Sequence, residues 1–222
     1  MKILVIAPHA DDEVLGCGGL LLRRSKEGNQ IGWLLVTSMK PGARWSPAQV
    51  REREMALQKV CEGLGISPSH FFRLNRDPAQ LERAPREELV MEISAVLESY
   101  QPDEVYLPHP GDAHSDHRAV FEASVAAAKW FRKPFIRRLL CYETLSETEA
   151  ALTIGPVFRP DVFVDISGYL EKKTSLMAKY SGEMAPFPFP RSAEAIRSLA
   201  TFRGTQAGFG AAEAFQLLRE RI

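Results

Sequence analysis

The chain has 222 residues, of which 45% are hydrophobic and 25% charged, a composition that excludes disordered, collagen-like and fibrous proteins. Its 28 basic residues balance 28 acidic ones, so there is no overall field to hold a nucleic acid or an anionic membrane. We therefore expect one domain over residues 1–222, with no nucleic-acid or membrane partner and with a specificity that comes from a local site.

The first half of the chain alternates apolar runs with helical patterns. Lys2 to Ala7 is a continuous aliphatic run, which is typical of a strand buried on both faces of a parallel sheet. A glycine-rich turn and a helix that starts at Leu20 lead to a second buried strand, Ile31 to Thr37. Two amphipathic helices are predicted next, over Gln49 to Gly65 and over Glu87 to Ser99.

The second half continues this alternation. Its predicted elements are a strand over Glu104 to Leu107, a helix over His114 to Trp130, strands over Arg138 to Tyr142 and Val162 to Ile166, a helix over Tyr169 to Tyr180, an extended loop over Met184 to Pro190, and a helical segment that runs to Leu199. Beyond it the chain is expected to close through Gly204, Gly208 and Gly210 without a further element. Alternating strands and helices predict an α/β fold with an open, mostly parallel sheet.

The cysteines indicate a reducing compartment. The chain has three cysteines, at Cys17, Cys61 and Cys141. Their odd number and the absence of CxxC spacing argue against a disulfide framework and against a cysteine zinc site. The apolar run after Lys2 is too short for a signal peptide, and no stretch reaches the roughly 18 apolar residues of a membrane span. We therefore expect a cytoplasmic protein, with Cys17 as a small buried hydrophobic residue.

Four of the five histidines follow two of the predicted strands. His9 comes directly after the first strand and precedes Asp11 and Asp12. The other three follow the strand that ends at Leu107, at His109, His114 and His117. Because the carboxyl ends of parallel strands line the ligand crevice of an open α/β sheet, the two loops are expected to meet in one metal site.

The residue types in these loops suit zinc. Two imidazoles and one carboxylate are ligands for a borderline-soft cation, and a catalytic site keeps its fourth position for water. His9, Asp12 and His117 would supply the three ligands, which leaves Asp11 beside the bound water as a base. His114 precedes His117 by three residues, near enough on a helix to serve the same reaction centre in proton transfer.

Other interpretations remain open at this point. The acidic run Asp11 to Glu13 would also suit a solvated cap at the positive end of the following helix. A metal-dependent phosphoesterase normally needs more bridging carboxylates, and a sugar-binding module with a structural metal would fill all four ligand positions. Gly16, Gly18 and Gly19 do not have the spacing of a dinucleotide-binding turn, so they are expected to allow close packing of a helix behind the metal loop.

The motifs together resemble a known family. Pro8-His9-Ala10-Asp11-Asp12-Glu13, followed by three glycines and by His114-Ser115-Asp116-His117, resembles the LmbE-like/PIG-L family of zinc-dependent N-acetylglucosamine deacetylases. The sequence departs from the family pattern at Ala10, where a proline is usual, and at Met39 to Gly42, where the family often has Thr-x-Gly. The resemblance implies a Rossmann-like three-layer sandwich with a mostly parallel sheet.

The resemblance also implies an activity, a metal-dependent N-deacetylase that hydrolyses a linear amide C–N bond. The substrate would be a small conjugate of N-acetylglucosamine, such as a bacillithiol or mycothiol precursor or a related sugar, and the products acetate and a free amine. One Zn²⁺ per chain, or another divalent metal, would be the cofactor. The aglycone and the association of chains into a homo-oligomer stay open.

The resemblance assigns a role to each candidate residue. The metal ligands would be His9, Asp12 and His117. Asp11 would accept the proton of the attacking water, and His114, oriented by Asp116, would stabilise the oxyanion or protonate the leaving amine. Arg51 and Asp77 would contact the substrate. The alternative for Arg51 is an exposed helix charge that pairs with Glu54.

Overall fold

The computed structural model describes residues 1–152 and 155–222, and within them the strands form a single seven-stranded sheet. The strands are β1 (Lys2–Ala7), β2 (Gln30–Thr37), β3 (Phe71–Arg76), β4 (Glu104–Pro108), β5 (Arg138–Tyr142), β6 (Val162–Asp165) and β7 (Ala212–Glu220). Their order across the sheet is β3-β2-β1-β4-β5-β7-β6. Strands β1 to β5 pair in parallel, and β7 is antiparallel to both of its neighbours. The predicted mostly parallel α/β sheet is confirmed.

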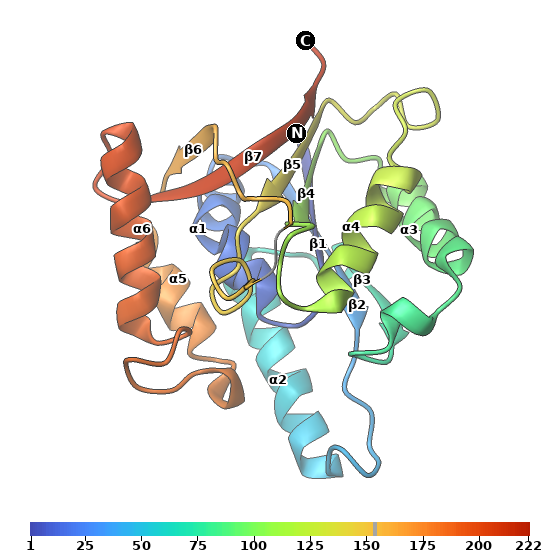
Figure 1. Cartoon of the computed structure of the whole chain (residues 1–222), viewed down its shortest axis with the longest axis horizontal. Helices are drawn as coiled ribbons and strands as arrows, with labels where there is room; N and C mark the ends of the chain where they lie inside the picture. Colours follow the sequence, from blue (N-terminus) through green and yellow to red (C-terminus); the bar gives the residue numbers. More distant parts are fainter. Residues whose placement is uncertain (153–154) are drawn as a thin grey trace.

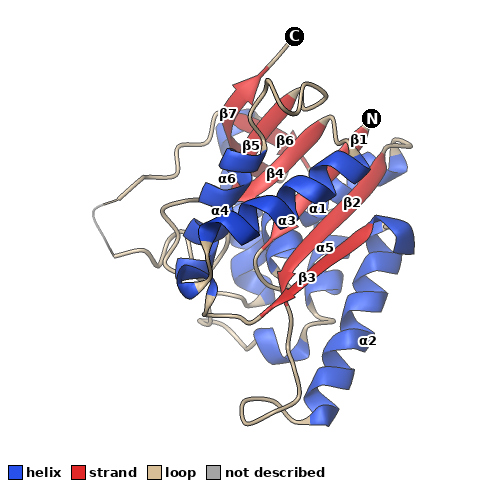
Figure 2. Cartoon of the chain, turned by 90° about the vertical axis from the view of Figure 1, so that its right-hand side faces the viewer, coloured by secondary structure: helices blue, strands red, loops and turns tan. Residues whose placement is uncertain are grey.

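Helices cover both faces of the sheet. They are α1 (Asp12–Lys26), α2 (Pro47–Leu64), α3 (Arg86–Tyr100), α4 (Ser115–Ala127), α5 (Leu170–Met177) and α6 (Ala193–Ala207), with short 3₁₀ turns η1 (Pro68–His70), η2 (Leu81–Arg83) and η3 (Ser181–Glu183). In Figure 1, α1, α5 and α6 lie on one side of the sheet and α3 and α4 on the other. Figure 2 shows α3 and α4 in front of the strands. The molecule therefore has three layers, as the family resemblance implied.

The first strand is apolar throughout because it is buried on both faces. Ile3 and Val5 belong to the core under α1, whereas Leu4 and Ile6 belong to the core under α3 and α4. Successive side chains of a strand point to opposite faces, so only a continuous apolar run satisfies both cores.

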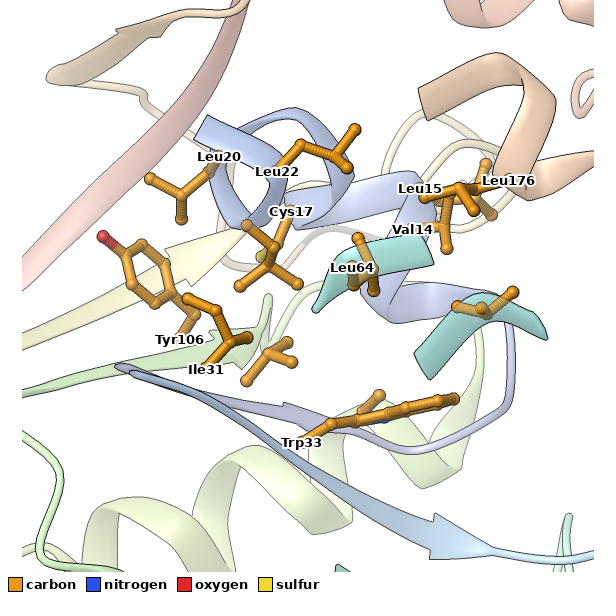
Figure 3. Packing of buried hydrophobic residues seen from close by; sticks show 14 of the residues in the cluster. Val14, Leu15, Cys17, Leu20, Leu22, Ile31, Trp33, Leu64, Tyr106 and Leu176 are labelled. Carbon is orange, nitrogen blue, oxygen red and sulfur yellow. The ribbon is translucent and has the colours of Figure 1, made fainter. Parts of the chain in front are cut away.

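Helix α1 begins at Asp12, well before the predicted start at Leu20, and carries the glycines within it. A Cβ atom at Gly16 would overlap the ring of Tyr142, and one at Gly19 would lie 2.6 Å from Ile166. The glycines thus allow close packing of this helix, as expected, and packing overrides their low helix propensity. Cys17 is fully buried in the same core, and Figure 3 shows it above side chains of the sheet such as Trp33.

We expect Gly16→Ala to lower the free energy of unfolding by about 1–3 kcal/mol, because the added methyl group must displace the buried Tyr142 ring. Urea denaturation followed by circular dichroism measures the change. Gly42→Ala is the matched control, since no atom lies within 4 Å of a Cβ built at that position. Equal stability of the two variants would contradict the packing role of Gly16.

The last part of the chain differs from the prediction. Helix α6 runs to Ala207 and includes Gly204, where the absence of a side chain lets the Phe209 carbonyl oxygen approach to 2.6 Å from the Cβ position. Strand β7 follows and was not predicted. Its residues include Ala, Glu, Leu and Arg, which are good helix formers, so only pairing with β5 and β6 decides its conformation.

Candidate metal centre

The two histidine-bearing loops lie at the carboxyl ends of β1 and β4, which are neighbours in the sheet. The chain continues from β1 to β2 on one side, whereas β4 lies on the other side, so the loops flank the point where strand order reverses. Ligands of open α/β proteins bind at such a point. One ligand atom from each of His9, Asp12 and His117 lies within 4.8 Å of the others, a grouping that could hold a metal ion.

Asp12 lies between the two histidines of this group. Its Oδ2 atom is 3.5 Å from His9 Nδ1 and 3.3 Å from His117 Nε2. Asp12 and His117 are buried, and His117 Nε2 has no hydrogen-bond partner among the described residues. A buried polar nitrogen without a partner is costly, and a cation bound between these atoms would satisfy it.

A second carboxylate contacts the far nitrogen of each histidine. His9 Nε2 lies 3.0 Å from Asp116 Oδ2, and His117 Nδ1 lies 2.8 Å from Asp112 Oδ2. Thr148 Oγ1 donates to the other oxygen of Asp112 at 2.7 Å. Histidines that bind metals usually donate their second N–H to such a carboxylate, which fixes the ring and raises its basicity.

Sequence reasoning did not identify Asp112. It lies in the loop between β4 and α4, five residues before His117, and its side chain is fully buried. The available signal was an acidic residue in the same loop as His109 and His114. Its buried position is fixed by the fold of the loop, which the spacing alone does not reveal.

The two adjacent aspartates have opposite electrostatic environments. Burial alone would raise the pKa of Asp12, but the charges of the adjacent His117 and His9 hold it well below its ordinary value. Burial, together with the charges of Asp12 and Glu183, raises the pKa of Asp11 well above its ordinary value. Neighbouring carboxyl groups with pKa values pushed apart are suited to different tasks at one reaction centre.

His114 caps the start of α4. Its Nδ1 atom accepts a hydrogen bond from the backbone N–H of Asp116 at 3.1 Å, and its ring centroid is 4.4 Å from that of His9. The Asp116 carboxylate is 4.0 Å from His114 Nδ1 and instead accepts from the amides of Ala79 and Leu81 and faces His9. The contact by which Asp116 holds His114 is therefore its backbone N–H.

A cavity of about 430 Å³ opens beside the group. His9, Asp11, Asp12 and His114 line one part of it, and Trp45 lines another. A volume of this size is that of a small-molecule binding site. His109 does not reach the cavity wall, because it is buried with its Nδ1 atom bonded to the Gly111 N–H.

Arg51 and Asp77 lie outside this cavity. The α2 residues that line it are Gln49, Glu52, Arg53, Glu54, Ala56 and Leu57. Arg51 is exposed and is not among them, because the helical period of 3.6 residues turns it away from this face. Its expected partner Glu54 pairs with Arg73 at 2.7 Å. Asp77 is also exposed and pairs with Lys40 at 2.6 Å.

Comparison with known families identifies the chain. The model of the PIG-L family, described as GlcNAc-PI de-N-acetylase, matches residues 4–128, which is more than half of the chain. The chain belongs to the PIG-L family. The resemblance seen in the motifs is thereby confirmed, and with it, at the level of the family, the prediction of a deacetylase, a hydrolase of amide bonds.

Two curated relatives are similar in sequence to this PIG-L chain. A diacetylchitobiose deacetylase from Thermococcus kodakarensis is 25% identical over 98% of this chain and 83% of its own length. A probable N-acetyl-alpha-D-glucosaminyl L-malate deacetylase 2 from Bacillus cereus is 22% identical over 82% of this chain and 83% of its own length. Both names describe deacetylation of an N-acetylated sugar.

Solved structures share the fold of this PIG-L chain. The conserved protein TT1542 from Thermus thermophilus matches with a TM-score of 0.79 at 27% identity, over 99% of this chain and 96% of its own. The 4-carboxy-2-hydroxymuconate hydratase GalB from Pseudomonas putida matches with a TM-score of 0.75 at 19% identity, over 100% of this chain and 97% of its own. A hydratase with the same fold shows that the site, not the fold, must carry the functional argument.

No helix in the part of the chain that the structure describes is both long and apolar enough to cross a membrane.

Proposed function

We propose that the protein is a zinc-dependent N-deacetylase that removes the acetyl group from a small N-acetylglucosamine conjugate and releases acetate and a free amine. The observation that carries the proposal is the buried His117, whose Nδ1 atom is bonded to Asp112 while its Nε2 atom faces Asp12 without a partner in the described chain. Such a histidine is prepared to bind a metal ion at Nε2.

His9, Asp12 and His117 would hold the ion. Two imidazoles and a carboxylate favour zinc, and three protein ligands leave room for water or substrate. A bound zinc ion would polarise the amide carbonyl and make a water molecule more acidic. Asp116 would hold the His9 ring, and Asp112 the His117 ring, in the orientation that metal binding requires.

Asp11 and His114 would move the protons. Asp11 lies on the cavity wall with a raised pKa, so its carboxylate is a stronger base than an ordinary aspartate toward the attacking water. His114 Nδ1 accepts a backbone hydrogen bond, so in the neutral ring the proton is on Nε2. From there it can be donated to the oxyanion or to the leaving amine.

The Asp112 carboxylate, which contacts His117 Nδ1, should contribute to metal affinity. We expect Asp112→Asn to weaken zinc binding by about 10- to 100-fold, because the neutral amide supports His117 less well. Competition with a chromophoric chelator measures the dissociation constant. Asp103→Asn is a control, since Asp103 accepts from the Lys2 N–H near the start of β1 and does not contact the site. Unchanged zinc affinity in Asp112→Asn would remove Asp112 from the centre.

The proposed reaction is tested directly by the release of free amine. N,N′-diacetylchitobiose, N-acetylglucosaminyl malate and N-acetylglucosaminyl inositol are incubated with the zinc-loaded protein, alongside a generic phosphate ester. Amine release that stops on chelation supports the proposal. Phosphate release would favour a phosphoesterase, and sugar binding without turnover would favour a binding module.

We also place the protein in the cytoplasm, because its three cysteines are free.

A further inference from the structure

The peptide group between Ala10 and Asp11 is held at both of its polar atoms. The Ala10 carbonyl oxygen accepts a hydrogen bond from Arg53 Nη1 at 2.7 Å. The Asp11 N–H donates to Glu13 Oε2 at 3.0 Å. Asp11 itself has φ 143° and ψ −29°, a backbone conformation that residues with a side chain rarely adopt and that persists only when its surroundings enforce it.

This unusual backbone separates the side chains of two consecutive aspartates. Asp12 lies beside the two metal-site histidines, and its Oδ2 atom also accepts the His9 N–H at 2.8 Å. Asp11 has Glu183 and Arg191 among the charges that act on it, and it lines the cavity. A rotation of the Ala10–Asp11 peptide would change the direction of the Asp11 carboxylate relative to Asp12.

One residue from a distant part of the chain contacts both groups that hold this peptide. Tyr180, three residues after the end of α5, donates its hydroxyl to Glu13 Oε1 at 2.6 Å. The guanidinium carbon of Arg53 lies 5.3 Å from the centroid of the Tyr180 ring. Tyr180 is 1% exposed and Glu13 is fully buried, so water does not compete for this contact.

We propose that Tyr180 is a positioning residue, which acts through Glu13 and Arg53 to hold the Ala10–Asp11 peptide and thereby direct the Asp11 carboxylate. The inference rests on the proposed function, in which Asp11 accepts a proton. Glu13 Oε1 accepts a hydrogen bond from the Tyr180 hydroxyl, which fixes the plane of the carboxylate. In that plane, Glu13 Oε2 accepts the hydrogen bond from the Asp11 N–H. Loss of the hydroxyl frees that plane to turn.

The chain contains a matched control for this contact. Tyr106 donates its hydroxyl to Glu104 Oε2 at 2.9 Å, and both residues are buried. Glu104 is the first residue of β4, whereas the metal site lies beyond the last residue of that strand. Tyr106→Phe therefore removes the same kind of buried hydrogen bond as Tyr180→Phe, at the opposite end of the sheet.

The kinetic test uses the zinc-loaded protein with N,N′-diacetylchitobiose. We expect Tyr180→Phe to lower kcat by about 10- to 100-fold, because small displacements of a catalytic group have effects of this size. KM and zinc content should stay within about twofold of wild type, since the ligands and the cavity wall remain. Tyr106→Phe should keep kcat within about threefold. Equal losses in both variants, or a change in KM alone, would overturn the positioning role.

Amide hydrogen exchange at Asp11, measured by NMR, tests the same inference without activity. Exchange should be at least about tenfold faster in Tyr180→Phe and unchanged in Tyr106→Phe, because only the first variant releases the Glu13 carboxylate. If the wild type deacetylates no sugar while Asp11 exchange still rises, the proposed function fails and the contact network stands. Unchanged exchange at Asp11 overturns the network whatever the activity.

A second variant covers the case in which Tyr180→Phe does not fold. Glu13→Gln keeps the size of the side chain but replaces one of its two acceptor oxygens by an NH₂ group, which cannot accept from the Tyr180 hydroxyl or from the Asp11 N–H. It should lower kcat and speed Asp11 exchange, with KM and zinc content unchanged. Where both single variants fold, the double variant should lose little more than the worse of the two, because they disturb one network. Wild-type kcat in Glu13→Gln, or additive losses in the double variant, would count against the inference.

Discussion

Asp11→Asn should lower kcat for amide hydrolysis by at least about 10²- to 10⁴-fold while the protein keeps about one zinc ion per chain. The amide preserves the shape of the side chain, and the three proposed ligands His9, Asp12 and His117 remain. The amide cannot accept the proton of the attacking water. Steady-state kinetics and elemental analysis on the same preparation measure the two quantities together.

The pH dependence of activity is a second test of the role of Asp11. Asp11 acts as a base only when deprotonated, so wild-type activity should rise with pH through the raised pKa of its carboxyl group. That rise should be absent from the residual activity of Asp11→Asn, since the titrating group is gone. Asp77→Asn is the control and should keep wild-type kinetics, because Asp77 is exposed and outside the cavity.

Two outcomes would contradict the assignment of the aspartates. Hydrolysis within a few-fold of wild type in Asp11→Asn would show that the water loses its proton to another group. A variant that binds no zinc would show that the roles of Asp11 and Asp12 are exchanged.

His117→Ala should abolish metal binding, with a fall in zinc affinity greater than the roughly 100-fold that loss of a supporting group can cause. The substitution removes a proposed ligand that is buried and whose Nε2 atom faces Asp12. Activity should disappear with the metal. His114→Ala is the matched variant, because it removes another histidine of the same pair of loops while leaving the three proposed ligands in place. It should keep zinc and lose mainly turnover.

The metal content of these variants also tests the arrangement of the site. A second group of potential ligand atoms, from His9, His114 and Asp116, shares His9 with the first. Equal loss of zinc in His117→Ala and His114→Ala would mean that the two histidines do not have separate roles. Two tightly bound ions per wild-type chain would contradict a one-metal site and favour the phosphoesterase interpretation.

The parts of the fold and of the site that sequence predicted depend on local patterns. The aliphatic run Lys2 to Ala7 is typical of a strand buried on both faces, and it is β1. The positions of His9 and His117 after two strands sufficed to bring them together, because carboxyl ends of parallel strands share one edge. Local pattern and a general rule of topology were enough here.

The parts that sequence missed depend on contacts between distant segments. The sequence named Arg51 as a substrate contact, whereas Arg53 is the α2 arginine that lines the cavity, because packing decides which face of α2 meets it. Tyr180 is 167 residues from the Glu13 side chain that it contacts. Strand β7 has a helix-forming composition and is a strand only because β5 and β6 flank it. No local pattern encodes such relations.

The position of β7 also orders the assembly of the molecule in time. β6 is an edge strand whose neighbour is β7, so it can join the sheet only after residues 212–220 have been synthesised. Glu213 of β7 then accepts the amides of Gly19 and Leu20 in α1, each at 2.7 Å. The helix that carries Asp12 therefore gains these two bonds from the last of the seven described strands to be synthesised, and a nascent chain holds an unfinished sheet edge until then.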